Sequence, residues 1–105
     1  MIKTVFISGK ITGLPVDVYT KNFATAEYFL SKKGYEVVNP LTITKGINPN
    51  DYAKLLAKCI EKLIPCDAIF MLNGWQDSRG ALIENYTAVT LGKEVLLESD
   101  GYYQQ

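Results

Sequence analysis

Short apolar runs, each closed by turn residues, predict four strands. The first run ends at Ser8-Gly9 and the second at Asn39-Pro40, both of which are typical of a chain leaving a strand. The predicted strands are Thr4–Ile7, Tyr35–Val38, Cys66–Leu72 and Glu94–Leu97. Because they are largely apolar on both faces, we expect them to be covered by helices on both sides of a sheet.

Between these runs, apolar residues recur at helical spacing and predict three helices. The first extends from about Asp17 to Lys33 and ends before a glycine, and the third extends from Ser78 to Leu91. The second begins at Asn48-Pro49, a capping residue followed by a proline. Its apolar stripe is Leu55, Leu56, Cys59, Ile60 and Leu63. Residues 42–48, 73–77 and 100–105 are expected to form loops, the last with at most partial order.

The alternation of strands and helices predicts a single α/β domain over residues 1–105. We expect a three-layer, Rossmann/flavodoxin-like arrangement with a four- or five-stranded, mostly parallel sheet. Ligands of such sheets bind beyond the carboxyl ends of the strands, where the strand order reverses. The loops at those ends start at Ser8, Asn39 and Asn73.

Composition excludes several kinds of chemistry. The chain has 11 Lys and Arg, 11 Asp and Glu, and no histidine. Zero net charge gives no reason to expect binding to nucleic acid polymers or anionic membranes, and it makes self-association easier. Without histidine, no Ser-His-Asp or Cys-His pair can form, and we expect no zinc or iron site and no cofactor. Any nucleophilic or acid–base work would depend on carboxylates, tyrosines, lysines or thiols.

The N-terminal apolar stretch is too short for a signal peptide or a membrane span. Cys59 and Cys66 have no metal-binding or redox spacing. We therefore expect two buried thiols in a cytoplasmic protein, with a disulfide as the less common alternative.

Glu84 is the most informative candidate. It lies three residues after Ala81 and four before Ala88, so it shares the inward face that these residues and Leu91 define on the third helix. An unpaired buried carboxylate is costly and raises its own pKa. Glu84 is therefore either functional or hydrogen-bonded, for example to a loop backbone.

Three further features have both a functional and a structural interpretation. Ser78, followed by Arg79 and Gly80, could form an anion site at a helix N-terminus, although an ordinary helix cap is the more frequent case. The loop from Ser8 to Gly13 is rich in glycine but is a weak phosphate-binding signal by itself. Trp75 could stack on a flat ring or close its loop against the sheet.

Together these residues resemble a known family. The pattern comprises Phe6-Ile7-Ser8-Gly9, Thr12-Gly13, Asn22-Phe23, Ala26-Glu27, Val38-Asn39-Pro40, Cys66-Asp67-Ala68-Ile69, Gly74-Trp75, Ser78-Arg79-Gly80-Ala81, Glu84 and Ala88. It resembles the DUF4406 family, which is similar to the nucleoside 2-deoxyribosyltransferases and to the 2'-deoxynucleoside 5'-monophosphate N-glycosidase. The resemblance covers essentially the whole chain.

The resemblance implies an enzyme that cleaves or transfers the N-glycosidic bond of a nucleoside or nucleotide. Glu84 would be the nucleophile that attacks C1' of the sugar, as in a retaining glycosidase. Ser78 would bind a 5'-phosphate, and homo-oligomers are expected because a neighbouring subunit often completes such sites. The implied substrate-binding residues are Ser8, Gly9, Lys10, Thr12, Gly13, Asn39, Trp75, Ser78, Arg79 and Gly80.

The sequence departs from the family pattern at three positions. Cys59 stands where an Asp usually helps to protonate the departing base, and Phe6 stands where a Tyr hydroxyl often contacts the nucleophile. Thr12 replaces an Arg of the monophosphate-specific enzymes, so Lys10 or Arg79 would have to supply the positive charge. An inactive or weakly active nucleotide-binding domain is therefore the alternative function, and a purely structural assembly domain is a third.

Overall fold

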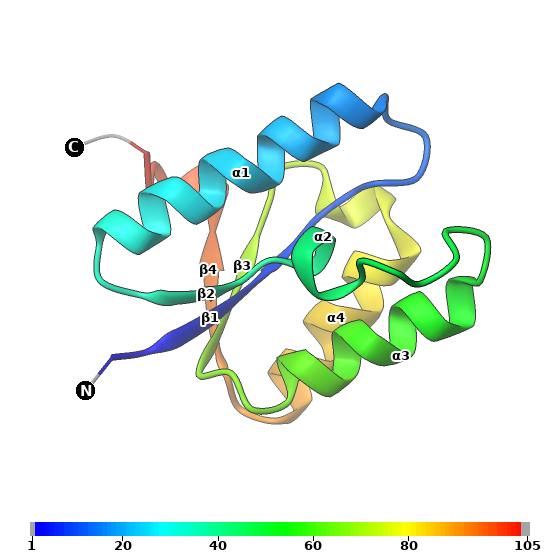
Figure 1. Cartoon of the computed structure of the whole chain (residues 1–105). Coiled ribbons are helices and arrows are strands. Elements are labelled where there is room, and N and C mark those ends of the chain that lie inside the picture. Colours follow the sequence, from blue (N-terminus) through cyan, green and yellow to red (C-terminus); the bar gives the residue numbers. More distant parts are fainter. Residues whose placement is uncertain (1, 104–105) are drawn as a thin grey trace.

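The fold is a four-stranded sheet in the order β2-β1-β3-β4, with every neighbouring pair parallel (Figure 1). The computed structural model describes residues 2–103. The strands are β1 (Thr4–Ser8), β2 (Glu36–Val38), β3 (Ala68–Met71) and β4 (Glu94–Leu97). The three-layer α/β architecture of the Rossmann/flavodoxin-like class is confirmed.

Helices cover both faces of this sheet (Figure 1). They are α1 (Val16–Lys32), α2 (Pro40–Ile43), α3 (Tyr52–Leu63) and α4 (Arg79–Thr90), and two 3₁₀ turns follow β3 and β4. The long helix α1 lies on one face, and α3 and α4 lie on the other. Within residues 2–103, none of the helices has the length and apolar character required to cross a bilayer. The expected cytoplasmic location stays a prediction.

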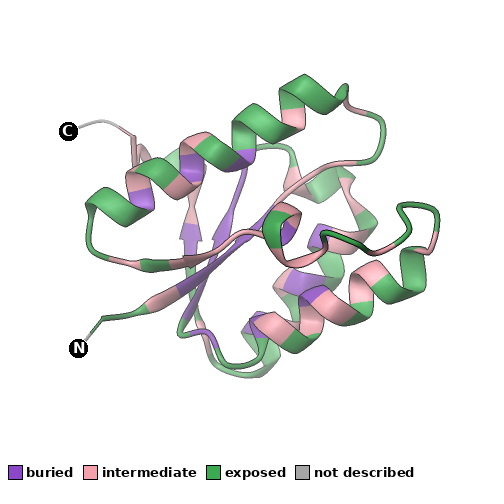
Figure 2. Cartoon of the chain, in the orientation of Figure 1, coloured by how far each residue is buried: buried purple, intermediate pink, exposed green. Residues whose placement is uncertain are grey.

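The two cores follow the alternation of side chains along β1. Val5 and Ile7 are fully buried on the face covered by α1, where they pack with Phe23 and Leu30. Phe6 points to the opposite face and joins a second core with Leu63 of α3. Successive side chains of a strand point to opposite faces, so Ser8 shares the side of Phe6 and faces α3 and α4. The central strands β1 and β3 are accordingly the most continuously buried part of the chain in Figure 2.

The carboxyl ends of β1 and β3 lie side by side at the centre of the sheet. The chain leaves β1 towards α1 on one face and leaves β3 towards α4 on the other, which opens a crevice between the two connections. Gly9 allows the two strand ends to approach closely, because a methyl group there would lie 2.6 Å from Cδ1 of Leu72. Packing against Leu72 therefore explains this glycine without any ligand.

Two predictions about local structure were wrong. The second predicted helix, α3, begins at Tyr52 rather than after Asn48, because Asp51 accepts the capping hydrogen bond from the Lys54 N–H at 3.1 Å. The Asn48 side chain instead accepts from the Asn50 N–H at 2.9 Å and forms a local turn. The short helix α2 was not predicted: the Asn39 carboxamide caps it at the Leu41 N–H. A cap followed by proline marks a helix start at this position, not only the end of a strand.

Two other expectations concern the C-terminal third of the chain. Leu91 is 52% exposed rather than inward-facing, because it lies at the C-cap, beyond the last helical turn of α4. The C-terminal segment, which was expected to be a loop, packs through Tyr102 and Tyr103 against the core on the α1 face of the sheet. Tyr102 meets Phe70 edge to face at 5.5 Å and Tyr103 stacks on Phe29 at 4.9 Å. Residues 104–105 lie outside the described part.

Candidate active site

Glu84 lies on the inward face of α4, as the spacing predicted. Its side chain is only 7% exposed, and Ala81 and Ala88, one turn to either side, are also buried. The small side chains of these alanines let the helix lie close to the sheet. The carboxyl group is thereby held against the end of β1.

The Ser8 hydroxyl is the hydrogen-bond partner of this carboxyl group. It donates to Glu84 Oε1 at 2.5 Å, and Ser8 itself is completely buried. The partner is therefore a strand side chain and not the loop backbone considered above. Within residues 2–103, no lysine or arginine forms an ion pair with Glu84, so the charge is stabilised by neutral donors alone.

Burial raises the pKa of Glu84 to about 7, from the 4.5 of an ordinary glutamate. The Ser8 hydrogen bond, and then a hydrogen bond from the Cys59 thiol, act in the opposite direction and lower it. The net result is a carboxyl group that is about half ionised near neutral pH. Such a pKa is typical of groups that carry out chemistry at that pH.

Cys59 faces this carboxyl group from α3. Burial, followed by the negative charge of Glu84 and its hydrogen bond, raises the pKa of the thiol to about 12. Cys59 thus stays protonated at neutral pH. Both Cys59 and Cys66 are free and buried, which agrees with the expectation of two buried thiols.

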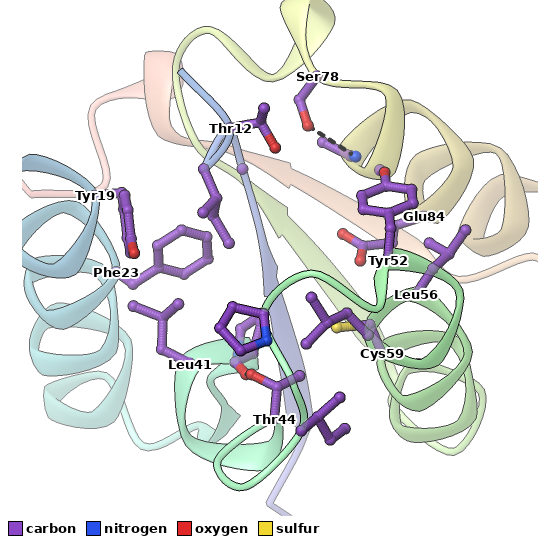
Figure 3. A pocket seen from close by; sticks show the side chains of 18 of the residues that line it. Thr12, Tyr19, Phe23, Leu41, Thr44, Tyr52, Leu56, Cys59, Ser78 and Glu84 are labelled. Atoms are coloured by element: carbon purple, nitrogen blue, oxygen red, sulfur yellow. Dashed lines mark hydrogen bonds between the residues drawn. The ribbon is translucent and has the colours of Figure 1, made fainter. Parts of the chain in front are cut away.

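Glu84 lines a cavity of about 380 Å³ beyond the carboxyl ends of the strands (Figure 3). The volume lies within the range of small-molecule sites. α3 and α4 form one wall, and α1, α2 and the loops after β1 and α2 form the others. In Figure 3, Thr12 and Ser78 lie at one end of the cavity, Thr44 lies at the other, and Glu84 lies between them.

Five of the predicted site residues meet in this cavity: Gly9, Thr12, Ser78, Gly80 and Glu84. Ser8 joins them through its bond to Glu84. Ser78 is also the N-cap of α4, where its oxygen accepts from the Ala81 N–H at 3.2 Å. The two interpretations of Ser78 are therefore compatible, because its O–H remains available for a ligand.

The other predicted site residues do not line the cavity. Arg79 is exposed on the first turn of α4, and Lys10 and Gly13 lie in the loop between β1 and α1 without lining the cavity. The Asn39 side chain has a structural role, because its oxygen caps α2 and its N–H donates to Glu27 at 2.9 Å. Trp75 packs against the core beneath α4, which is the structural one of its two interpretations.

Sequence reasoning missed much of the rest of the cavity lining. It includes Tyr19 and Phe23 of α1, Tyr52 at the start of α3, and Thr44, Lys45 and Ile47 between α2 and α3. Lys45 is the only cationic residue among those that line the described cavity. Apolar spacing places Phe23 on an inward face, but no local signal places the loop after α2 over the site.

Among residues 2–103, no three His, Cys, Asp or Glu side chains are grouped closely enough to hold a metal ion. Asp67, at the head of β3, is used structurally and accepts from the Thr4 N–H at 2.9 Å. Among the residues that line the described cavity, Glu84 supplies the carboxyl group and Cys59 the thiol.

A family model described as a domain of unknown function (DUF4406) matches residues 3–97. The chain therefore belongs to this family. Comparison with curated proteins gives no match.

Eleven chains of solved structures match this one. One is the CMP N-glycosidase BcmB from Clostridium botulinum, which is 27% identical with a TM-score of 0.58. The alignment covers 90% of this chain and 67% of the glycosidase. The resemblance to N-glycosidases stated from the motifs is thus confirmed at the level of fold and family.

The pKa of Glu84 predicts a specific pH dependence of stability. Because the pKa is higher in the folded state, the folded protein binds this proton more tightly than the unfolded chain. The stability from this proton is fully present below pH 4.5 and is lost as the pH rises to about 7. The shift corresponds to about 3 kcal/mol.

We expect Glu84→Gln to remove this contribution. In urea unfolding from pH 4.5 to 8, the free energy of unfolding of the wild type should fall relative to that of the variant by about 3 kcal/mol. A constant difference between the two proteins over this range would show that Glu84 titrates normally.

Proposed function

We propose that this protein cleaves the N-glycosidic bond of a nucleotide or nucleoside with Glu84 as the nucleophile. The observation that carries the proposal is a buried carboxyl group, hydrogen-bonded by Ser8, that faces a cavity of suitable size. Membership of DUF4406 and the 27% identity to a CMP N-glycosidase support it.

In the proposed reaction, an ionised oxygen of Glu84 attacks C1' of the sugar. The C1'–N bond breaks, its electron pair leaves with the base, and a glycosyl ester forms on Glu84. The base takes up a proton. Water then attacks C1', the C1'–O bond to Glu84 breaks, and the free sugar and the carboxylate are released with loss of a proton from the water.

The cavity suggests which residues bind which part of the substrate. Ser78, at the N-terminus of α4, would bind a 5'-phosphate together with Thr12 at the same end of the cavity. Lys10 and Arg79 do not line the cavity, and Lys45, which does, follows Thr44 at the end opposite Ser78. The 5'-phosphate would therefore depend on the Ser78 and Thr12 hydroxyls and on the N-terminus of α4.

Two alternatives are distinguished by their products. If a second base rather than water resolves the intermediate, the enzyme is a 2-deoxyribosyltransferase, and a new nucleoside appears only when a free base is added. A nucleotide-binding domain without turnover is favoured by Cys59, whose pKa of about 12 makes it a weak proton donor to the departing base.

Substitution of Glu84 tests the nucleophile directly. With ribo- and deoxyribonucleoside 5'-monophosphates, the wild type should release free base, and Glu84→Gln should lower the rate by a factor on the order of 10³ or more. Chromatography with mass detection measures the base, and peptide mapping with a slow fluorinated substrate should locate the sugar on Glu84. Glu61→Gln, an exposed acid of α3, is the matched control. Full activity of Glu84→Gln would exclude this mechanism.

Ser8 should control the pH at which the nucleophile becomes active. Since only ionised Glu84 can attack, kcat/KM should rise with pH and level off above about 7. Ser8→Ala removes the hydrogen bond that lowers the pKa of Glu84, so the rise should move to higher pH. Ser31→Ala, an exposed serine of α1, serves as control. An unchanged profile for Ser8→Ala would mean that Glu84 does not govern the rate.

We also propose that the protein forms a homo-oligomer through the outer face of α4. Leu82, Ile83, Tyr86 and Val89 are exposed there, with Tyr86 at 75%, and an apolar helix face of this kind is typical of protein contacts. Sedimentation velocity should show a dimer or larger species for the wild type and a monomer for Tyr86→Glu. A monomeric wild type at micromolar concentration would contradict the proposal.

A further inference from the structure

Tyr52 has an unusual environment for the first residue of a helix. Its ring lines the cavity, yet the residue remains 50% exposed. Its hydroxyl makes no hydrogen bond with any residue of the described range 2–103. A phenol at a cavity wall without a protein partner is free to donate to and accept from a ligand.

Gly80 provides the space that Tyr52 occupies. A methyl group at this position would lie 2.9 Å from the Tyr52 hydroxyl oxygen, closer than side-chain carbons pack. Gly80 lies inside α4 without the positive φ that would require glycine there, and glycine is a poor helix former. The close contact with Tyr52 therefore explains why glycine occupies position 80.

This contact places the hydroxyl between the two proposed binding points. Glu84 lies one helical turn after Gly80, and helical side chains tilt towards the N-terminus, so its carboxyl group points back towards the Gly80 turn. Ser78 caps the same helix two residues before Gly80. In Figure 3 the Tyr52 ring stands beside Glu84, and its hydroxyl is directed towards the end of the cavity where Ser78 lies.

We propose that Tyr52 is a substrate-binding residue whose hydroxyl hydrogen-bonds a hydroxyl of the substrate sugar. This role rests on the proposed function, in which C1' lies at Glu84 and the 5'-phosphate lies at Ser78. The sugar then lies between Glu84 and Ser78, beside the Tyr52 hydroxyl. Phe6 has no hydroxyl and the Ser8 hydroxyl is bound to Glu84, whereas Tyr52 brings a hydroxyl to the cavity on the side of Glu84.

The test compares Tyr52→Phe with the wild type on cytidine and deoxycytidine 5'-monophosphates. Loss of one hydrogen bond should lower kcat/KM about 5- to 10-fold while the thermal midpoint stays within about two degrees. In a Glu84→Gln background, which should bind without turnover, Tyr52→Phe should weaken the Kd for cytidine 5'-monophosphate in calorimetry by a similar factor. A loss confined to the ribonucleotide would place the bond at the 2'-hydroxyl, and an equal loss would place it at the 3'-hydroxyl.

Tyr28→Phe, an exposed tyrosine of α1, is the matched control and should behave as the wild type. Gly80→Ala gives a second, independent readout. Its methyl group should displace Tyr52 and lower kcat/KM, and the same substitution should cost little when Tyr52 is already alanine.

The outcomes separate this inference from the proposed function. Activity or nucleotide binding in the wild type with no change in Tyr52→Phe would overturn only the role of Tyr52. Absence of both from the folded wild type would overturn the proposed function, and the role of Tyr52 with it.

Discussion

The hydrogen bond between Ser8 and Glu84 is the interaction on which the candidate site depends. It joins the carboxyl end of β1 to the inward face of α4, two segments 76 residues apart in the sequence. A buried carboxyl group without a donor would be strongly destabilising when charged, and one beside a lysine would remain ionised and weakly basic. A neutral donor produces the intermediate case, in which the pKa of Glu84 is about 7. Glu84 can therefore take either its protonated or its ionised form near neutral pH.

The alternation of side chains along β1 makes this interaction possible. Val5 and Ile7 fill the core beneath α1, while Phe6 and Ser8 point to the helices on the other face. Because Phe6 is fully buried in that core, it anchors the strand on the side where Ser8 meets Glu84. The missing tyrosine hydroxyl at position 6 therefore does not leave the carboxyl group without a donor. The donor comes from the next residue on the same face.

Elements defined by periodicity could be predicted from the sequence, whereas the loops that close the cavity could not. The strand Glu94–Leu97 and the inward position of Glu84 followed from side-chain spacing, which depends only on the geometry of the local element. The family resemblance implied Asn39 and Trp75 as site residues, and both lie near the correct sheet edge, yet their side chains point into the fold. Position near an edge does not determine the direction of a side chain. Tyr52 and the loop after α2 depend on long-range packing, which no local pattern encodes.

Two of the three departures from the family pattern, Phe6 and Cys59, affect different halves of the proposed reaction. Glu84, the proposed nucleophile, has its donor in Ser8, so the replacement by Phe6 is compensated within the same strand. No proton donor of comparable quality is assigned to the departing base. Cys59 occupies the position of the usual acid, and its pKa of about 12 reflects burial and the neighbouring charge of Glu84. Each contribution that favours an ionised Glu84 also makes Cys59 harder to deprotonate, because the two groups face each other in a medium that screens charge poorly. The thiol therefore serves better as a fixed donor to Glu84 than as an acid for the base. In this arrangement the departing base must obtain its proton from solvent or from another group at the opening of the cavity.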